Sequence, residues 1–212
     1  MTDQEIMLVA KKYSMTSGTN LMTTIDTMHW LDNNNILGDI VECGVWRGGH
    51  IIAAMLAAVT DRSFWLFDTF DGMTEPGVQD SRKGIHASMT TRYKKTGAKG
   101  WCRAELDEVR DNVEQYRQSN QTVEYVSGPV ELTLSTQRLP RHIALLRLDT
   151  DWYASTKAEL EVLWPRVVID GVVIIDDYLS WQGCKQACDE YFGKDFEFTH
   201  VDGPAIKLVK KQ

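Results

Sequence analysis

The sequence predicts an α/β fold built on a mostly parallel sheet, and three observations carry this prediction. Short apolar strands alternate with helical segments through most of the 212 residues. The strand at residues 40–43 runs into a glycine turn and then into an alanine-rich helix. Several predicted strands end in an acidic residue, and parallel strands share the edge where open α/β sheets bind ligands. We therefore expect helices on both faces of the sheet and a ligand site at that edge.

The composition indicates one domain and argues against several classes of function. A chain of 212 residues can bury one substantial core, and we find no internal repeat and no second domain. The net charge is −7 and no run of Lys or Arg stands out, which argues against a nucleic-acid partner. No stretch approaches the roughly 18 consecutive apolar residues of a membrane helix, and no signal peptide is apparent. The four cysteines lack disulfide or zinc spacing, which favours reduced thiols in a cytoplasmic protein.

Apolar periodicity places the elements along the chain. Residues 1–37 have helical periodicity with a polar break at 13–18, which predicts two packing helices. Further helices are expected at 51–58, at 103–118, from a capping-box pattern at 156–159 to Trp164-Pro165, and at 181–192. Parallel strands are expected at 40–43, 64–68, 122–126, 141–148 and 167–175, the last with an irregularity at Asp170-Gly171. Extended pieces at 197–201 and 205–209 predict a hairpin that adds an antiparallel strand.

Residues 69–104 differ in character from the rest of the chain. They are largely polar, contain scattered glycines and lack strong periodicity. Long segments of this kind in compact domains are usually functional or disordered. We therefore predict a mobile lid over about residues 69–104.

The glycine turn after the first strand is a candidate cofactor cradle. Gly44, Gly48 and Gly49 lie between a strand and a helix, where backbone N–H groups can face a ligand. Their order differs from the dinucleotide fingerprint, and Glu42 precedes the turn. An acid there would repel a pyrophosphate and suit a cationic ligand, such as S-adenosylmethionine (SAM). Asp68 ends the second strand, 24 residues after Gly44, where a carboxylate can accept hydrogen bonds from a ribose diol.

Acidic residues also follow two other predicted strands. Asp149 and Asp151 follow one strand, and the pair Asp176-Asp177 follows the next. Helix capping explains a single Asp in such a position, but it does not explain several acids at one sheet edge. Uncompensated carboxylates repel one another, and a hard divalent cation such as Mg²⁺ resolves this repulsion. Neither His nor Cys lies near the cluster in sequence, which makes zinc a poorer candidate.

Several motifs in this order resemble the macrocin O-methyltransferase family. They are Met15–Ser17, Val41–Gly49, Phe67–Gly72, Leu145–Thr156, Val173–Tyr178 and Trp181–Cys184. The resemblance implies the Rossmann-like class I methyltransferase fold, a three-layer sandwich. Its seven-stranded sheet has the order 3-2-1-4-5-7-6, with the last strand antiparallel. It also implies SAM-dependent, Mg²⁺-dependent methylation of hydroxyls on sugars of natural products.

Carried over residue by residue, the resemblance implies roles for named positions. Cofactor-binding residues would be Met15, Thr16, Ser17, Glu42, Gly44, Trp46, Gly48, Gly49, His50, Asp68, Thr69, Ser127, Gly128 and Asp149. Metal ligands would be Asp149, Asp176 and Asp177, and the catalytic residues would be Asp151, as the base, and Asp149. The segment 1–37 would cover the cofactor, and residues 38–212 would form the SAM-binding domain. His50 stands where relatives usually have a small residue, and Leu179 replaces a common Gly.

The implied mechanism joins these residues. A metal-bound sugar hydroxyl would have a lowered pKa, and Asp151 would take its proton. Two adjacent hydroxyls could chelate the metal, which favours a vicinal diol in a sugar or glycoside acceptor. Three alternatives stay open: methylation of phenolic diols, a hydroxylase-like relative that acts with a partner protein, and a SAM-binding sensor without turnover. The acceptor, the methylated position and homo-oligomer formation also stay open.

Overall fold

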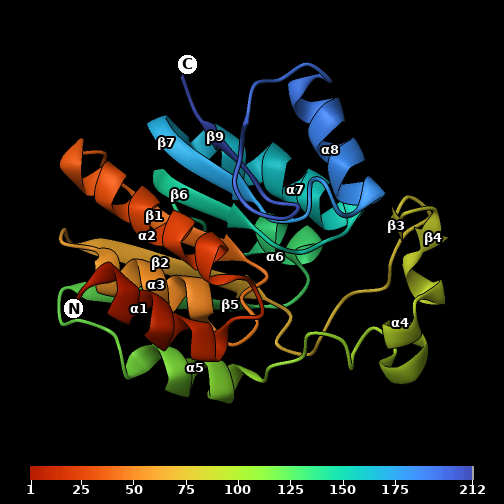
Figure 1. The fold of residues 1–212 in the computed structure, drawn as a ribbon, viewed down its shortest axis with the longest axis horizontal. Helices are drawn as coiled ribbons and strands as arrows, with labels where there is room; N and C mark the ends of the chain where they lie inside the picture. Colours follow the sequence, from red (N-terminus) through yellow and green to blue (C-terminus); the bar gives the residue numbers. More distant parts are fainter. Residues whose placement is uncertain (212) are drawn as a thin grey trace.

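The computed structural model describes residues 1–211, which form a central sheet with helices on both faces (Figure 1). The sheet strands are β1 (Asp39–Cys43), β2 (Arg62–Asp68), β5 (Gln121–Ser127), β6 (Ile143–Leu148), β7 (Val167–Ile175), β8 (Thr199–His200) and β9 (Ile206–Val209). The helices are α1 (Asp3–Ala10), α2 (Gly18–Asn33), α3 (Gly49–Ala57), α4 (Thr91–Thr96), α5 (Leu106–Glu114), α6 (Val130–Thr136), α7 (Tyr153–Leu163) and α8 (Gln182–Phe192).

The seven strands lie in the order β5-β2-β1-β6-β7-β9-β8. The first five are parallel to one another, and β9 is antiparallel to both of its neighbours. This order is the 3-2-1-4-5-7-6 arrangement that the family resemblance implied, so the expected fold is confirmed. The carboxyl ends of β1, β2, β5, β6 and β7 consequently share one edge of the sheet.

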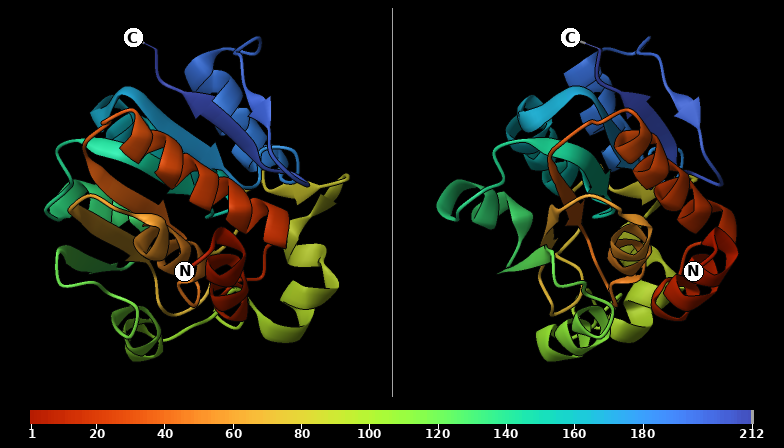
Figure 2. Two further views of the ribbon diagram at one scale, coloured as in Figure 1. Left: turned by 60° about the vertical axis from the view of Figure 1, so that its left-hand side comes forward. Right: turned by 90° about the vertical axis from the view of Figure 1, so that its left-hand side faces the viewer.

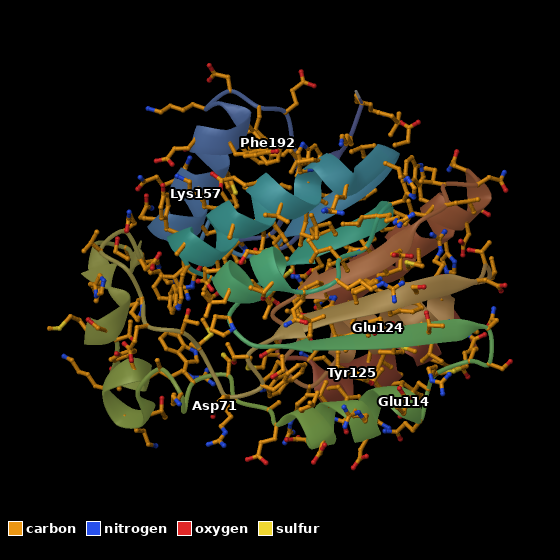
Figure 3. All side chains as sticks on the ribbon, turned by 180° about the vertical axis from the view of Figure 1, so that it is seen from behind. Asp71, Glu114, Glu124, Tyr125, Lys157 and Phe192 are labelled. Carbon is orange, nitrogen blue, oxygen red and sulfur yellow. The ribbon has the colours of Figure 1, made fainter. Side chains whose placement is uncertain are left out.

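The sheet separates two apolar cores because its central strands bury both faces. Ile40 of β1 packs with α1, α2, α3 and α5, whereas its neighbour Val41 packs on the side of α7 and α8. Phe64 and Trp65 of β2 alternate in the same way. Figures 1 and 2 show α1–α3 over one face, and Figure 3 shows α6 and α7 over the other. Within residues 1–211 no helix has the length and apolar character that crossing a bilayer requires.

The structure corrects one boundary and adds two α-helices. The expected capping box at 156–159 is wrong, because α7 begins at Tyr153, after Trp152 as N-cap. Thr156 and Glu159 are instead buried inside the helix, and Glu159 accepts a hydrogen bond of 2.9 Å from the Thr150 hydroxyl. Helix α6 lies in a stretch with no predicted element, and α4 lies within residues 69–104, where no helix was expected. The irregularity in β7 is confirmed, since Asp170 has φ 60° and the register with β6 shifts there.

Residues 69–104 form local structure outside the main sheet. A two-stranded hairpin of β3 (Ser81–Arg82) and β4 (Ile85–His86) is followed by α4, at the right of Figure 1. The fully buried Asp80 anchors this segment, because its Oδ1 accepts the N–H of Tyr153 at 2.8 Å and its Oδ2 accepts the N–H of Gly77 at 2.7 Å. The Trp152 indole donates to the Thr74 carbonyl at 3.0 Å. The segment is therefore tied to the start of α7, directly after Asp151.

Candidate active site

A cavity of about 390 Å³ opens at the shared edge of the parallel strands. Its walls come from the ends of β1, β2, β6 and β7, the start of α3, the segment before α2, and residues 69–102. Most of the residues that the sequence singled out line it. These are Met15, Thr16, Glu42, Gly44, Trp46, Gly49, His50, Asp68, Thr69, Gly128, Asp149, Asp151, Asp176 and Asp177. Ser17, Gly48 and Ser127 do not line it: Ser17 caps α2, Gly48 caps α3, and Ser127 is exposed.

The glycine turn brings backbone against backbone. Gly44 has φ 81°, and a Cβ there would lie 2.0 Å from the Asp149 carbonyl oxygen, so only glycine lets β1 and β6 meet this closely. A Cβ on Gly49 would lie 2.6 Å from the Ser14 Cβ. The two glycines therefore join three parts of the cavity wall: the end of β1, the end of β6 and the segment before α2.

Asp68 organises the turn as well as facing the cavity. Its Oδ2 accepts the backbone N–H groups of Val45 at 2.7 Å and Trp46 at 3.0 Å, and its Oδ1 accepts that of Phe70 at 2.9 Å. Burial raises the pKa of Asp68, and these N–H donors act in the opposite direction. The ribose contact stays a prediction, and the structure adds a role in loop geometry that the sequence did not indicate.

A buried arginine, which the sequence reasoning missed, lies between the acids of the site. Arg147 of β6 is 2% exposed, and its guanidinium lies 3.3 Å from Glu42, 3.0 Å from Asp149 and 2.9 Å from Asp176. Burial nevertheless raises the pKa of Glu42 to about 8, because Arg147 offsets only part of the desolvation. One cation thus links the acid beside the glycine turn to the acids after β6 and β7.

Three carboxylates converge beyond this arginine. Ligand atoms of Asp149, Asp151 and Asp177 all lie within 4.8 Å of one another. Burial raises the pKa of Asp151 to about 7, and burial with the neighbouring acids raises those of Asp149 and Asp177 well above the ordinary value. Asp151 has φ 68°, a strained conformation for a non-glycine residue. The cluster therefore holds oxygen donors together in an arrangement that a bound cation or proton would stabilise.

Asp176 lies next to the converging carboxylates, and its contacts are to other groups. Its Oδ1 accepts hydrogen bonds from the Arg147 guanidinium at 2.9 Å and from the Asn20 amide at 2.8 Å. The trio that converges is thus Asp149, Asp151 and Asp177, whereas the sequence grouped Asp149, Asp176 and Asp177 as metal ligands. Asn20, a buried polar residue on α2, was not among the predicted site residues. Its hydrogen bond to Asp176 is what connects it to the site.

The segment before α2 lines the cavity and also contacts His50. The His50 ring contacts the Thr16 hydroxyl through Nε2 at 2.9 Å and the Thr24 hydroxyl through Nδ1 at 2.8 Å. Burial lowers the pKa of His50 well below its ordinary value, so the ring is neutral near pH 7. The two hydroxyls thus hold the His50 ring, which ties the segment before α2 and α2 itself to the start of α3.

Tryptophans form the opposite wall. Trp101 and Trp181 both line the cavity, with ring centroids 6.1 Å apart. Trp152 packs edge-on against both, at 5.9 Å from Trp101 and 5.0 Å from Trp181. These residues are far apart in sequence, and no local pattern brought them together. Their apolar wall faces the same space as the acids.

Known proteins resemble this chain in both sequence and structure. The family model for macrocin O-methyltransferase matches residues 8–204. Demethyldecarbamoylnovobiocin O-methyltransferase of Streptomyces niveus is 38% identical over 165 residues, which are 76% of this chain and 60% of that protein. An 8-demethyl-8-(2,3-dimethoxy-alpha-L-rhamnosyl)-tetracenomycin-C 4'-O-methyltransferase of Streptomyces olivaceus is 35% identical over 184 residues, 82% of this chain and 66% of its own length. The chain thus spans about two thirds or less of these relatives.

Solved structures agree with the fold. The O-methyltransferase NovP superposes with a TM-score of 0.78 at 30% identity, covering 94% of this chain and 83% of its own. The calicheamicin methyltransferase CalS11 superposes with a TM-score of 0.65 at 20% identity, covering 98% and 90%, which supports the fold alone. With the family model matching nearly the whole chain, this protein belongs to the macrocin O-methyltransferase family.

Proposed function

We propose that this protein is a SAM- and Mg²⁺-dependent O-methyltransferase that acts on a hydroxyl of a sugar or glycosylated small molecule. One observation carries the proposal: a single cavity joins the glycine turn and Glu42 to a converging cluster of carboxylates. A cofactor that donates a group and an acceptor that receives it need such a shared space. The names of the relatives, which methylate novobiocin and rhamnosyl-tetracenomycin precursors, support a glycoside as acceptor.

The cavity fits SAM in its charges and in its shape. Glu42 lines it without a hydrogen-bond partner for Oε2 within residues 1–211, so this buried oxygen is free to accept from a ligand amino group. Gly49 lets the Tyr13–Ser14 segment pack against the start of α3, which closes this side of the cavity. We assign Met15, Thr16 and His50 to the covering wall of the cofactor site, and Asp68 to the ribose. A bound SAM would supply an electrophilic methyl group.

The carboxylates fit a hard divalent cation through their donor set, which consists of oxygen atoms. We assign Asp149, Asp176 and Asp177 as its ligands. Asp149 and Asp177 belong to the converging trio, and both contacts of Asp176 use Oδ1. A bound Mg²⁺ would lower the pKa of an acceptor hydroxyl. We assign Asp151 as the base, because its carboxylate lies within reach of both Asp149 and Asp177 and its pKa of about 7 suits proton transfer near neutral pH.

The remaining walls would position the acceptor and keep out water. Trp101 and Trp181 provide apolar faces for the carbon face of a sugar or for its aglycone. Residues 69–104 would act as the lid, and Asp80 would be the point at which this segment stays attached to α7. Excluding water favours methyl transfer to the acceptor over loss of the methyl group to solvent.

The test is a methyl-transfer assay with labelled SAM and matched acceptors. Glycosides with vicinal diols, the same sugars with a blocked diol, and catechols should be compared with Mg²⁺ and with EDTA. We expect transfer to a glycoside with a free diol, and loss of transfer in EDTA. Transfer to catechols but to no glycoside would favour phenolic acceptors. SAM binding without transfer to any acceptor would favour a non-catalytic role.

A further inference from the structure

One stretch of the lid has a charge opposite to that of the whole protein. Residues 81–104 contain no Asp or Glu, although the chain has a net charge of −7. They contain seven of its 23 Lys and Arg residues: Arg82, Lys83, Arg92, Lys94, Lys95, Lys99 and Arg103. Two of these, Arg82 and Arg92, line the cavity that also contains the carboxylate cluster. The cavity is therefore acidic at the sheet edge and basic at the lid.

The two arginines lack the ion pairs that occupy other basic residues of the segment. Lys99 and Arg103 approach Asp71 at 3.0 and 3.6 Å, and Asp71 is labelled in Figure 3. Within residues 1–211, neither Arg82 nor Arg92 has a carboxylate within ion-pair distance. Their guanidinium groups are thus available to an external anion.

Each arginine lies next to a buried residue. Arg82 follows the buried anchor Asp80 by two residues, and it belongs to the hairpin strand β3. The Arg92 guanidinium lies 5.8 Å from the ring centroid of Trp101, a residue that is itself buried in the cavity wall. An arginine stacked on an aromatic ring keeps its N–H groups directed outward for a planar anion. These two positions make a basic rim that faces the cavity.

We propose that the acceptor carries an anionic group, a phosphate ester or a carboxylate, and that Arg82 and Arg92 bind it. This inference rests on the proposed methyltransferase function and narrows its acceptor class. Asp149, Asp151 and Asp177 repel an anion, whereas two guanidinium groups bind one through charge-assisted hydrogen bonds. The acceptor is thereby oriented, with its anion at the lid and its hydroxyls toward the carboxylates. Arg82 and Arg92 are specificity residues in this arrangement.

Binding to the protein saturated with S-adenosylhomocysteine tests the proposal without turnover. The probes are rhamnose 1-phosphate, a nucleoside-diphosphate rhamnose, and neutral methyl rhamnoside, together with methyl glucuronide and methyl glucoside as the carboxylate pair. Calorimetry should show at least one anionic probe binding about 10–100-fold more tightly than its neutral partner, the scale of a charged hydrogen bond. The comparison between phosphate and carboxylate probes identifies the anion. The difference should shrink as NaCl increases.

Three variants complete the test. Arg82→Gln and Arg92→Gln should each weaken the anionic probe by about tenfold or more while leaving the neutral probe within about twofold. Lys83→Gln, which changes the adjacent exposed cation outside the cavity wall, is the matched control and should bind like the wild type.

Several outcomes would overturn the inference while S-adenosylhomocysteine still binds normally. They are equal binding of anionic and neutral probes, no binding of any anionic probe, and unchanged anion binding in both arginine variants. Weaker S-adenosylhomocysteine binding in the arginine variants would also overturn it, because the arginines would then belong to the cofactor site. A wild-type protein that fails to bind S-adenosylhomocysteine would instead refute the proposed function.

Discussion

The two sides of the cavity are built in different ways. The carboxylates stand at the ends of parallel strands, and Arg147 is buried among them with three acids within 3.3 Å. The other side, formed by residues 69–104, carries exposed cations on a hairpin and a short helix, held to the core by Asp80 and Trp152. A rigid sheet edge suits chemistry that needs fixed geometry, whereas an anchored segment outside the sheet suits recognition of varied acceptors. The difference suggests that acceptor choice can change in this fold without disturbing the carboxylates.

The largest expected effect belongs to the sheet edge. Asp151→Asn keeps the shape of the side chain but removes the proton acceptor, so turnover should fall roughly 10²–10⁴-fold. Binding of S-adenosylhomocysteine should remain within about twofold, which shows that the cofactor site is intact. Steady-state rates and calorimetry check this prediction. Normal turnover in Asp151→Asn would show that another group is the base.

Breaking the central ion cluster should affect stability most. Arg147→Met leaves Glu42, Asp149 and Asp176 without their shared cation, which should cost about 3–5 kcal/mol in the free energy of unfolding. Urea denaturation measures this change in the free energy of unfolding. The exposed Arg110→Met, which loses an ion pair with Asp107, should change stability by about 0.5 kcal/mol or less. Equal losses in both variants would contradict the role of Arg147.

The same cluster gives the stability of the metal-free protein a pH dependence. The pKa of Glu42 is raised from 4.5 to about 8 in the folded protein. A group with a raised folded-state pKa contributes stability below its unfolded pKa and loses it as pH rises through the folded value. Stability should thus fall between about pH 4.5 and pH 8, and more steeply in Arg147→Met. A rise of stability over this range, measured without divalent cations, would contradict this account.

A smaller effect should separate the two roles of Asp68. Asp68→Ala removes the acceptor for three backbone N–H groups and for the proposed ribose contact, and cofactor affinity should weaken by about 1.5–3 kcal/mol. Calorimetry with S-adenosylhomocysteine and its 2'-deoxy analogue distinguishes these roles. The wild type should prefer the 2'-hydroxyl, and the variant should not. A variant that keeps this preference would leave Asp68 with the loop role alone.

The smallest effect should come from the anchor of the lid. Asp80→Ala removes the hydrogen bond to the first N–H of α7, which should cost about 1–2 kcal/mol, as for the loss of a helix cap. Hydrogen exchange should become faster across residues 72–100 while the strands stay protected. Asp71→Ala, at the exposed base of the segment, is the control and should change exchange much less. In the wild type, cofactor and acceptor together should slow exchange in this segment, as expected for a lid.

Local patterns predicted the sheet edge well but not the contacts across the site. Strands, the turn at Gly44 and the acids after β6 and β7 each leave a signal within about ten residues of sequence. Arg147 leaves no such signal, because its role depends on ion pairs with Glu42, Asp149 and Asp176, which come together only in the folded protein. The start of α7 was misplaced because Thr156 and Glu159 match a capping box in sequence, whereas Asp80 caps the helix from 73 residues away.

The central claim is that the carboxylates bind a catalytic divalent cation, and direct metal binding tests it. Mn²⁺ can replace Mg²⁺ as a spectroscopic probe, and electron paramagnetic resonance counts the bound ions. We predict one Mn²⁺ per chain in the wild type and in Asp151→Asn, much weaker binding in Asp149→Asn and Asp177→Asn, and methyl transfer that stops in EDTA. Full transfer in EDTA, or Mn²⁺ binding that neither Asp149→Asn nor Asp177→Asn weakens, would contradict the account.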